Sequence, residues 1–145
     1  MINLLIGAPG GGKSYEAVVF HILEALKKGR KVITNLALHV EAFGFMEPGY
    51  VDLIELRHET LGPKVALGGK QLNRAAFSHV QDYGDKWRHP VNGGGPLYVI
   101  DECHIALPKV GTPIAVEEWY SLHRHEFADV LLISQSYGKL NVAIK

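Results

Sequence analysis

The fold is decided by the stretch Gly7-Ala-Pro-Gly-Gly-Gly-Lys13-Ser14 (GAPGGGKS), which satisfies the pattern G-x-x-x-x-G-K-[ST] at every fixed position. Glycines let the backbone curl so that several N–H groups point inward, and they leave no Cβ in the way of phosphate oxygens. Residues 2–6 (INLLI) form the continuous apolar run of a buried parallel strand, and residues 13–28 show a helical pattern. A glycine loop between such a strand and helix predicts a phosphate site at the amino end of the helix.

This motif, a P-loop (Walker A), gives each of its residues a task. Lys13 is expected to reach the β and γ phosphates of ATP or GTP, and the hydroxyl of Ser14 is expected to ligate Mg²⁺. The residues expected to bind the nucleotide are Gly7, Ala8, Pro9, Gly10, Gly11, Gly12, Lys13 and Ser14 of this motif, together with Asn35.

Outward from the motif, three more apolar runs predict strands, at residues 31–36, 97–100 and 130–134. Strands that alternate with helical segments predict an α/β fold with a parallel sheet. A Gly- and Pro-rich stretch, about 37–96, is expected to be an irregular insertion, with a strand at 50–56 and a helix at 71–87. A further helix is expected at 116–126.

Two carboxylates, Asp101 and Glu102, follow the apolar run at 97–100. Ligands of open α/β sheets bind at the carboxyl ends of the strands. Asp101 is therefore expected to hold Mg²⁺ and its water shell, and Glu102 to polarise the attacking water as a general base. Gln135, after the run at 130–134, is a candidate sensor of the γ-phosphate, and Asn35 is a candidate partner for Glu102.

The remaining reactive side chains are few. Arg124 is a candidate arginine finger that acts on a neighbouring subunit, because a planar guanidinium neutralises transition-state charge. Its neighbours His123 and His125 have no matching Cys/His spacing elsewhere, which argues against a transition-metal site. The single cysteine, Cys103, is expected to be a small buried apolar residue.

Length and composition bound the function. The chain has 145 residues, the size of one domain, and its 15 Lys and Arg balance 15 Asp and Glu. Such a balance gives no concentrated positive field for nucleic acid or membrane. There is no apolar run of the roughly 18–20 residues that would cross a bilayer. The abrupt end of the chain suggests that the natural protein continues beyond residue 145.

Four segments together resemble the N-terminal domain of the zonula occludens toxin (Zot) family, which is related to the gene I assembly proteins of filamentous phages. They are LIGAPGGGKS at 5–14, KVITNLAL at 31–38, YVIDECH at 98–104 and SLHRHEFADVLLISQSYGKLNVAIK at 121–145. The resemblance spans most of the chain, and the insertion contributes little to it. The family often has Arg near the end of the last segment, where this chain has Lys145.

The resemblance implies a three-layer α/β/α P-loop ATPase of the additional-strand, catalytic-glutamate type, related to pumping ATPases. Its visible core strands would lie in the order 1-4-3-2, which brings Gln135 between Ser14 and Asp101 and places Asn35 beside Glu102. It also implies a cytoplasmic domain that works as a homo-oligomeric ring in phage assembly and export, with phage DNA or assembly proteins as partners. Contact with the inner membrane would come only from a segment after residue 145.

Three alternatives differ in class. The stretch DECH at 101–104 matches a helicase box, but helicases need two tandem domains of this kind. A nucleotide kinase needs arginines clustered around the transferred phosphate, whereas Arg57, Arg74 and Arg88 are scattered through the insertion. A nucleotide-dependent assembly module with negligible turnover is the third alternative, and the sequence does not separate it from a motor.

Overall fold

The computed structural model describes residues 2–6, 17–63, 73–121, 127–135, 137–141 and 144. Its centre is a five-stranded, wholly parallel sheet in the order β1-β5-β4-β2-β3. The strands are β1 (Ile2–Ile6), β2 (Val32–Thr34), β3 (Ile54–Leu56), β4 (Leu97–Ile100) and β5 (Asp129–Ser134). The predicted order of four core strands is confirmed, and β3 adds a fifth strand beside β2.

Both faces of the sheet are buried, which explains the continuous apolar runs. Successive residues of a strand point to opposite faces. Tyr98 and Ile100 of β4 thus join one core cluster, while Leu97 and Val99 join the other. The residues of β5 divide in the same way.

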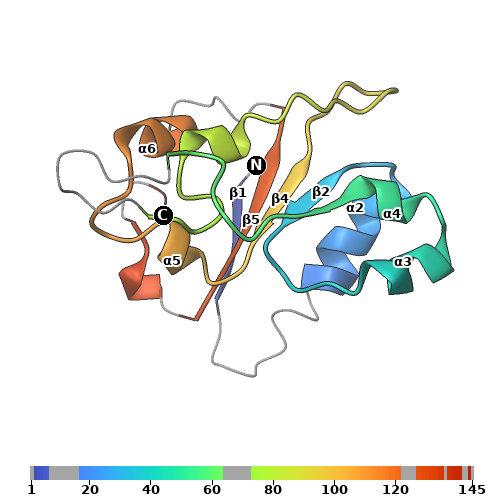
Figure 1. Cartoon of the computed structure of the whole chain (residues 1–145), viewed down its shortest axis with the longest axis horizontal. Coiled ribbons are helices and arrows are strands. Elements are labelled where there is room, and N and C mark those ends of the chain that lie inside the picture. Colours follow the sequence, from blue (N-terminus) through green and yellow to red (C-terminus); the bar gives the residue numbers. More distant parts are fainter. Residues whose placement is uncertain are drawn as a thin grey trace.

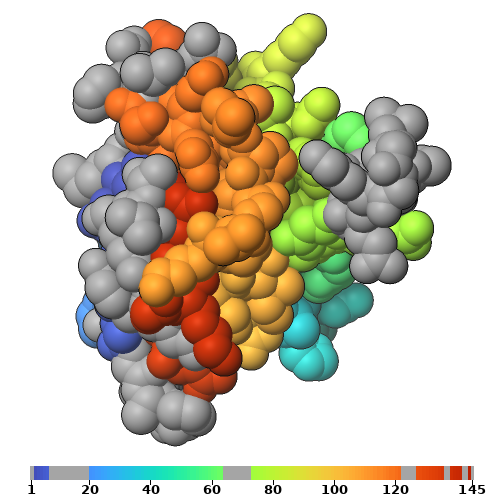
Figure 2. All heavy atoms as spheres, turned by 90° about the vertical axis from the view of Figure 1, so that its left-hand side faces the viewer, coloured from blue at the N-terminus to red at the C-terminus, as the bar shows by residue number. Residues whose placement is uncertain are grey.

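Helices cover the two faces to give the predicted three layers (Figure 1). One face carries the helical segment η1 (Ala17–Ile22) and α2 (Leu23–Lys27), with α3 (Val40–Met46) and α4 (Tyr50–Leu53) beyond them. The other face carries α5 (Cys103–Ala106), α6 (Ile114–Ser121) and the short 3-10 helix η2 (Val80–Tyr83). Figure 2 views the molecule from that second side, where residues 103–121 (gold to orange) lie beside the C-terminal residues (red). The short 3-10 helix η3 (Tyr137–Lys139) follows β5.

Helix predictions outside the insertion agree with the described residues. The predicted helix at 13–28 is helical over residues 17–27, where η1 has π-helical geometry. The predicted helix at 116–126 is observed as α6, which begins two residues earlier; residues 122–126 lie outside the described part. No helix in the described part of the chain is long and apolar enough to span a membrane.

The insertion differs from its prediction. The strand expected at 50–56 divides into helix α4 and the three-residue strand β3. The helix expected at 71–87 is wrong over its described residues, 73–87, which contain only η2. Phe77 has a left-handed φ of 71°, which a right-handed helix does not tolerate.

Packing explains the conformation of Phe77. Its fully buried ring packs on Tyr83 and Tyr98, with ring centroids 5.9 Å away in each case. The hydroxyl of Tyr83 donates to the carbonyl of Phe77 at 2.7 Å. Nearby, the carboxylate of Asp82 accepts from the hydroxyl of Thr60 and from the backbone N–H groups of Leu61 and His79. These tertiary contacts outweigh the helical pattern of the local sequence.

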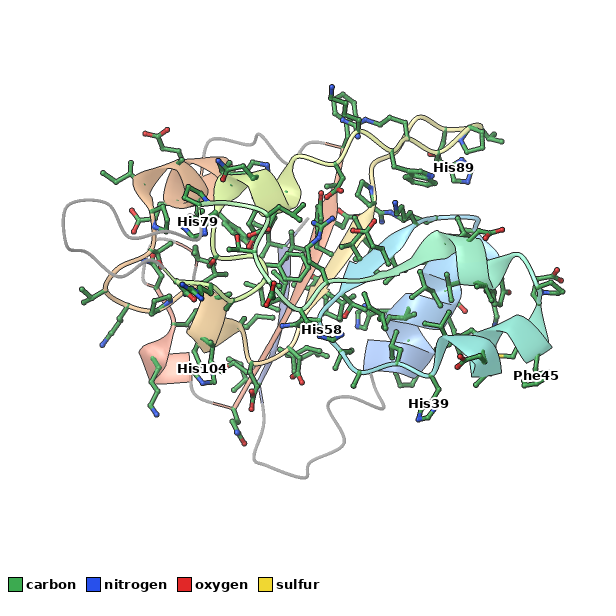
Figure 3. The ribbon with its side chains drawn as sticks, viewed as in Figure 1. His39, Phe45, His58, His79, His89 and His104 are labelled. Carbon is green, nitrogen blue, oxygen red and sulfur yellow. The ribbon has the colours of Figure 1, made fainter. Side chains whose placement is uncertain are left out.

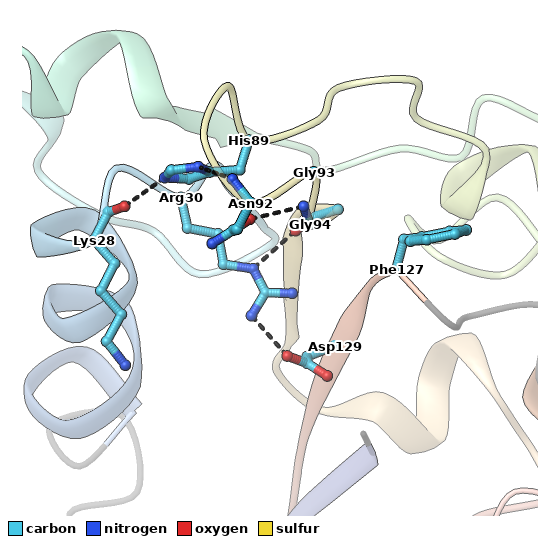
Figure 4. A pocket seen from close by; sticks show the side chains of 9 residues that line it. Lys28, Arg30, His89, Asn92, Gly93, Gly94, Phe127 and Asp129 are labelled. Atoms are coloured by element: carbon cyan, nitrogen blue, oxygen red, sulfur yellow. Dashed lines mark hydrogen bonds and ion pairs between the residues drawn. The ribbon is translucent and has the colours of Figure 1, made fainter.

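At the amino edge of the sheet, Arg30 ties three segments together (Figure 4). Its guanidinium donates to Asp129 at 2.7 Å and to the carbonyls of Gly95 and Pro96. The turn before it places Gly29 at a φ of 75°, the left-handed conformation in which many helices end. Burial disfavours ionisation of Asp129, but hydrogen bonding and the charge of Arg30 outweigh it and lower the pKa of Asp129.

We expect Asp129→Asn to lower the free energy of unfolding by about 1 kcal/mol near neutral pH, because it removes the charge that Arg30 binds. The pKa of Asp129 is lowered in the folded state, so this stabilisation is present above its ordinary value of 3.8 and is lost as the pH falls through the folded pKa. Urea unfolding at about pH 7 and about pH 3 checks this, with the exposed Asp52→Asn as control. An equal difference between wild type and Asp129→Asn at both pH values would contradict it.

Candidate functional site

Four of the predicted site residues lie at the carboxyl edge of the sheet. Thr34 lies opposite Val99, and Ile100 lies opposite Leu132, so β2, β4 and β5 end near one another. The residues that follow these strands are Asn35, then Asp101 with Glu102, and Gln135, in the spatial order of the strands. The edge therefore assembles a cluster of amides and carboxylates from segments distant in sequence.

The fourth strand end at this edge belongs to β1. Ile6, its last residue, pairs with Ser134, and Gly7 is the next residue in the chain. The P-loop residues 7–14, including Lys13 and Ser14, lie outside the described residues, as does Arg124. Their predicted roles stay predictions.

The side chain of Asn35 hydrogen-bonds to the backbone of Asp101, the first of the two acidic residues. Its Nδ2 donates to the carbonyl of Asp101 at 3.0 Å, and its Oδ1 accepts from the N–H of Asp101 at 2.6 Å. The sequence placed Asn35 at the right strand end but assigned it to the side chain of Glu102; among the described residues, both ends of its amide instead bind the main chain of Asp101. The ends of β2 and β4 are thereby fixed to each other.

Thr34, which sequence reasoning missed, reinforces this junction. Its hydroxyl is fully buried and donates to the carbonyl of Val99 at 2.8 Å. The same oxygen accepts from the N–H of Leu36 at 3.1 Å. A β-branched polar residue at the end of a buried strand, followed by Asn, was the available signal.

Glu102 has a strained backbone, with φ 47° and ψ 50° in the left-handed region. Its N–H donates to Oδ1 of Asp101 at 3.0 Å, and its carbonyl accepts from Ile105 in the first turn of α5. This conformation costs a residue with a side chain about 1–2 kcal/mol. Such strain is concentrated at functional sites, and here it lies at the predicted general base.

The chemistry of the donors fits the predicted Mg²⁺. Hard divalent cations prefer carboxylate oxygens, and Asp101 places one, half-buried, at the strand ends. Glu102 is exposed, where a water can reach it, and Gln135 is exposed after the buried Ser134. The arrangement can therefore hold a cation with one acid while the other accepts a proton from water.

The neighbouring thiol takes no part in this chemistry. Cys103 is fully buried, and burial raises its pKa to about 12, so it is a protonated thiol at neutral pH. The prediction that Cys103 is a small buried residue is confirmed.

A cavity of about 350 Å³ lies at the opposite, amino edge of the sheet (Figure 4). Arg30 and His89 line it, but both use their polar atoms on the protein, Arg30 on Asp129 and His89 on the carbonyl of Lys28. Its polar lining thus joins neighbouring segments, and the cavity is separate from the cluster around Asp101.

The parallel sheet, with acids at the carboxyl end of β4 and the P-loop motif directly after β1, has the fold of P-loop NTPase domains. Two solved structures share it. The N-terminal domain of zonular occludens toxin from Neisseria meningitidis aligns with 99% of this chain and 71% of its own length, at a TM-score of 0.55 and 18% identity. The genome packaging NTPase B204 from Sulfolobus turreted icosahedral virus 2 aligns with 99% of this chain and 68% of its own, at a TM-score of 0.62 and 15% identity.

Sequence comparison gives the family. The model described as zonular occludens toxin (Zot) matches residues 1–145, and the chain belongs to this family. The Gene 1 protein of Xanthomonas phage phiLf is 32% identical over 149 residues. That alignment covers 96% of the chain and 31% of the phage protein, so the chain spans less than a third of that relative's length.

The strain in the left-handed backbone of Glu102 can be tested by substituting glycine. We expect Glu102→Gly to raise the free energy of unfolding by about 1 kcal/mol, because glycine adopts this conformation without a steric penalty. In the control Glu118→Gly, on an exposed position of helix α6, the same exchange should lower it by about 1 kcal/mol. Chemical denaturation measures both, and a loss of stability in Glu102→Gly would contradict the assignment of strain.

Proposed function

We propose that this chain is a Mg²⁺-dependent ATPase domain that acts as a motor in the assembly or export of a filamentous phage. The observation that carries the proposal is the convergence of Asp101, Glu102 and Gln135 at the strand ends beside the strand that leads into the P-loop motif. Membership of the Zot family and the similarity to the Gene 1 protein of a phage support the biological setting. The same setting would place the domain in the cytoplasm.

Each residue has a task in the proposed hydrolysis. Lys13 binds the β and γ phosphates, while Ser14 and Asp101 provide oxygen ligands for the cation. Mg²⁺, when bound, neutralises charge that develops on the phosphate oxygens. Glu102 accepts the proton of the water that attacks the γ phosphorus, releasing ADP and phosphate. Gln135 orients that water.

Arg124 completes the proposed site from a neighbouring copy. A guanidinium supplied across a subunit interface stabilises the charge of the transferred phosphoryl group. Turnover would then rise steeply with protein concentration as subunits assemble. A module that binds nucleotide with negligible turnover would show no such rise, and this distinguishes the rival function.

Nucleotide binding is tested by calorimetric titration of ATP with Mg²⁺ into wild type and Lys13→Ala. We expect micromolar binding by wild type and a loss of at least about tenfold in Lys13→Ala, because the ammonium forms charge-assisted hydrogen bonds with the phosphates. Lys28→Ala, an exposed lysine at the opposite edge of the sheet, is the matched control and should bind as wild type does. Equal affinity of Lys13→Ala and wild type would remove the P-loop from the proposal.

Hydrolysis is tested with Glu102→Gln, which keeps the shape of the side chain and removes the base. We expect phosphate release to fall by about 10²-fold or more while affinity for ATP is retained, so that bound ATP accumulates. Glu118→Gln serves as the control for the same exchange on α6. Unchanged turnover in Glu102→Gln would show that another group activates the water.

A further inference from the structure

We propose that His104 is a positioning residue. Through its contact with Ser134, it fixes helix α5, and with it Glu102, against the end of β5. The inference rests on the proposed ATPase function, because the position of Glu102 matters only if Glu102 acts on the water. It assigns a task to a side chain adjacent to the acids that the hydrolytic scheme leaves unused.

The contact joins the start of α5 to the end of β5. Nδ1 of His104 lies 3.3 Å from Oγ of Ser134, a residue only 1% exposed. The second residue of α5 therefore contacts a buried hydroxyl at the end of β5.

Ser134 lies between the segments that would sense the nucleotide. It pairs with Ile6, the residue before Gly7, and is followed by Gln135. A shift of the end of β5 would displace the hydroxyl of Ser134, which His104 of α5 contacts. Figure 3 shows His104 on α5, far from His89 at the other end of the molecule.

The position of Glu102 depends on the contact between His104 and Ser134, because the backbone of Glu102 is held from both sides. On the side of β4, Asn35 fixes both backbone groups of Asp101. On the other side, α5 has only four residues, and its first turn closes on the carbonyl of Glu102. So short a helix is not stable by itself, and its orientation follows from its contacts with the sheet. Without the contact between His104 and Ser134, the backbone of Glu102 would be held only on the side of β4.

The test compares His104→Phe with His104→Asn. Phenylalanine keeps the ring but no polar atom, whereas asparagine keeps a polar atom at the δ position, where it can still bond to Ser134. We expect His104→Phe to lower kcat for Mg·ATP hydrolysis about tenfold with KM changed less than about twofold, since small misplacement of a reacting group costs rate more than binding. His104→Asn should recover kcat to within about threefold of wild type. Ile105→Ala, an exposed neighbour on α5, is the control and should leave both constants unchanged.

Ser134→Ala provides an independent route, because it removes the same contact by deleting one oxygen. If His104 acts through Ser134, kcat of Ser134→Ala should also fall, and the double variant Ser134→Ala/His104→Phe should lose no more than the larger single loss. Circular dichroism and thermal melts establish that each variant is folded.

The outcomes separate the two claims. Wild-type kcat in folded His104→Phe or Ser134→Ala, or additive losses in the double variant, would overturn the positioning role while leaving the ATPase proposal intact. A loss in His104→Phe that His104→Asn does not recover would also overturn it. Absence of turnover in wild type at any protein concentration would overturn the ATPase proposal and, with it, this inference.

Discussion

The parallel pairing of β5 with β1 on one side and β4 on the other determines where the site residues lie. It places the strand that ends at Ser134 between the strand that leads into the P-loop and the strand that ends in two acids. Both faces of β5 are buried, so a shift of one residue would exchange its two core faces. The register is therefore strongly specified, and the position of the acidic residues relative to β1 follows from it.

At the carboxyl edge of the sheet, rigid strand ends lie next to a residue with a strained backbone. Asn35 and Thr34 fix the end of β2 to β4 through buried or half-buried hydrogen bonds, while Glu102 takes a left-handed conformation that its side chain disfavours. A rigid frame is what allows the strained residue to persist. The backbone that carries this exposed carboxylate is held in place, which lowers the entropy lost on reaching a reactive geometry.

Much of the fold was predictable because strands buried on both faces leave continuous apolar runs. The segments LYVI and VLLIS were recognisable for this reason, whereas the order of the strands came from the family resemblance. The helix expected at 71–87 does not form because tertiary contacts determine the left-handed conformation of Phe77 and the hydrogen bonding of Asp82. At the site, strand ends located Asn35, Asp101 and Gln135, but which atoms meet depends on side-chain geometry. The backbone clamp of Asn35 and the contact between His104 and Ser134 leave no pattern in the sequence.

The position of the bound nucleotide on the folded chain can be measured directly by NMR. Mn²⁺ in place of Mg²⁺, added with ATP to isotopically labelled protein, broadens the NMR signals of nearby amides through paramagnetic relaxation. If the nucleotide binds at the carboxyl ends of the strands, the signals of Asn35, Asp101, Glu102 and Gln135 broaden most, and those of Arg30 and Asp129 at the other edge broaden least. Broadening centred on the amino edge, or none at saturating nucleotide, would contradict a nucleotide site at the carboxyl ends of the strands.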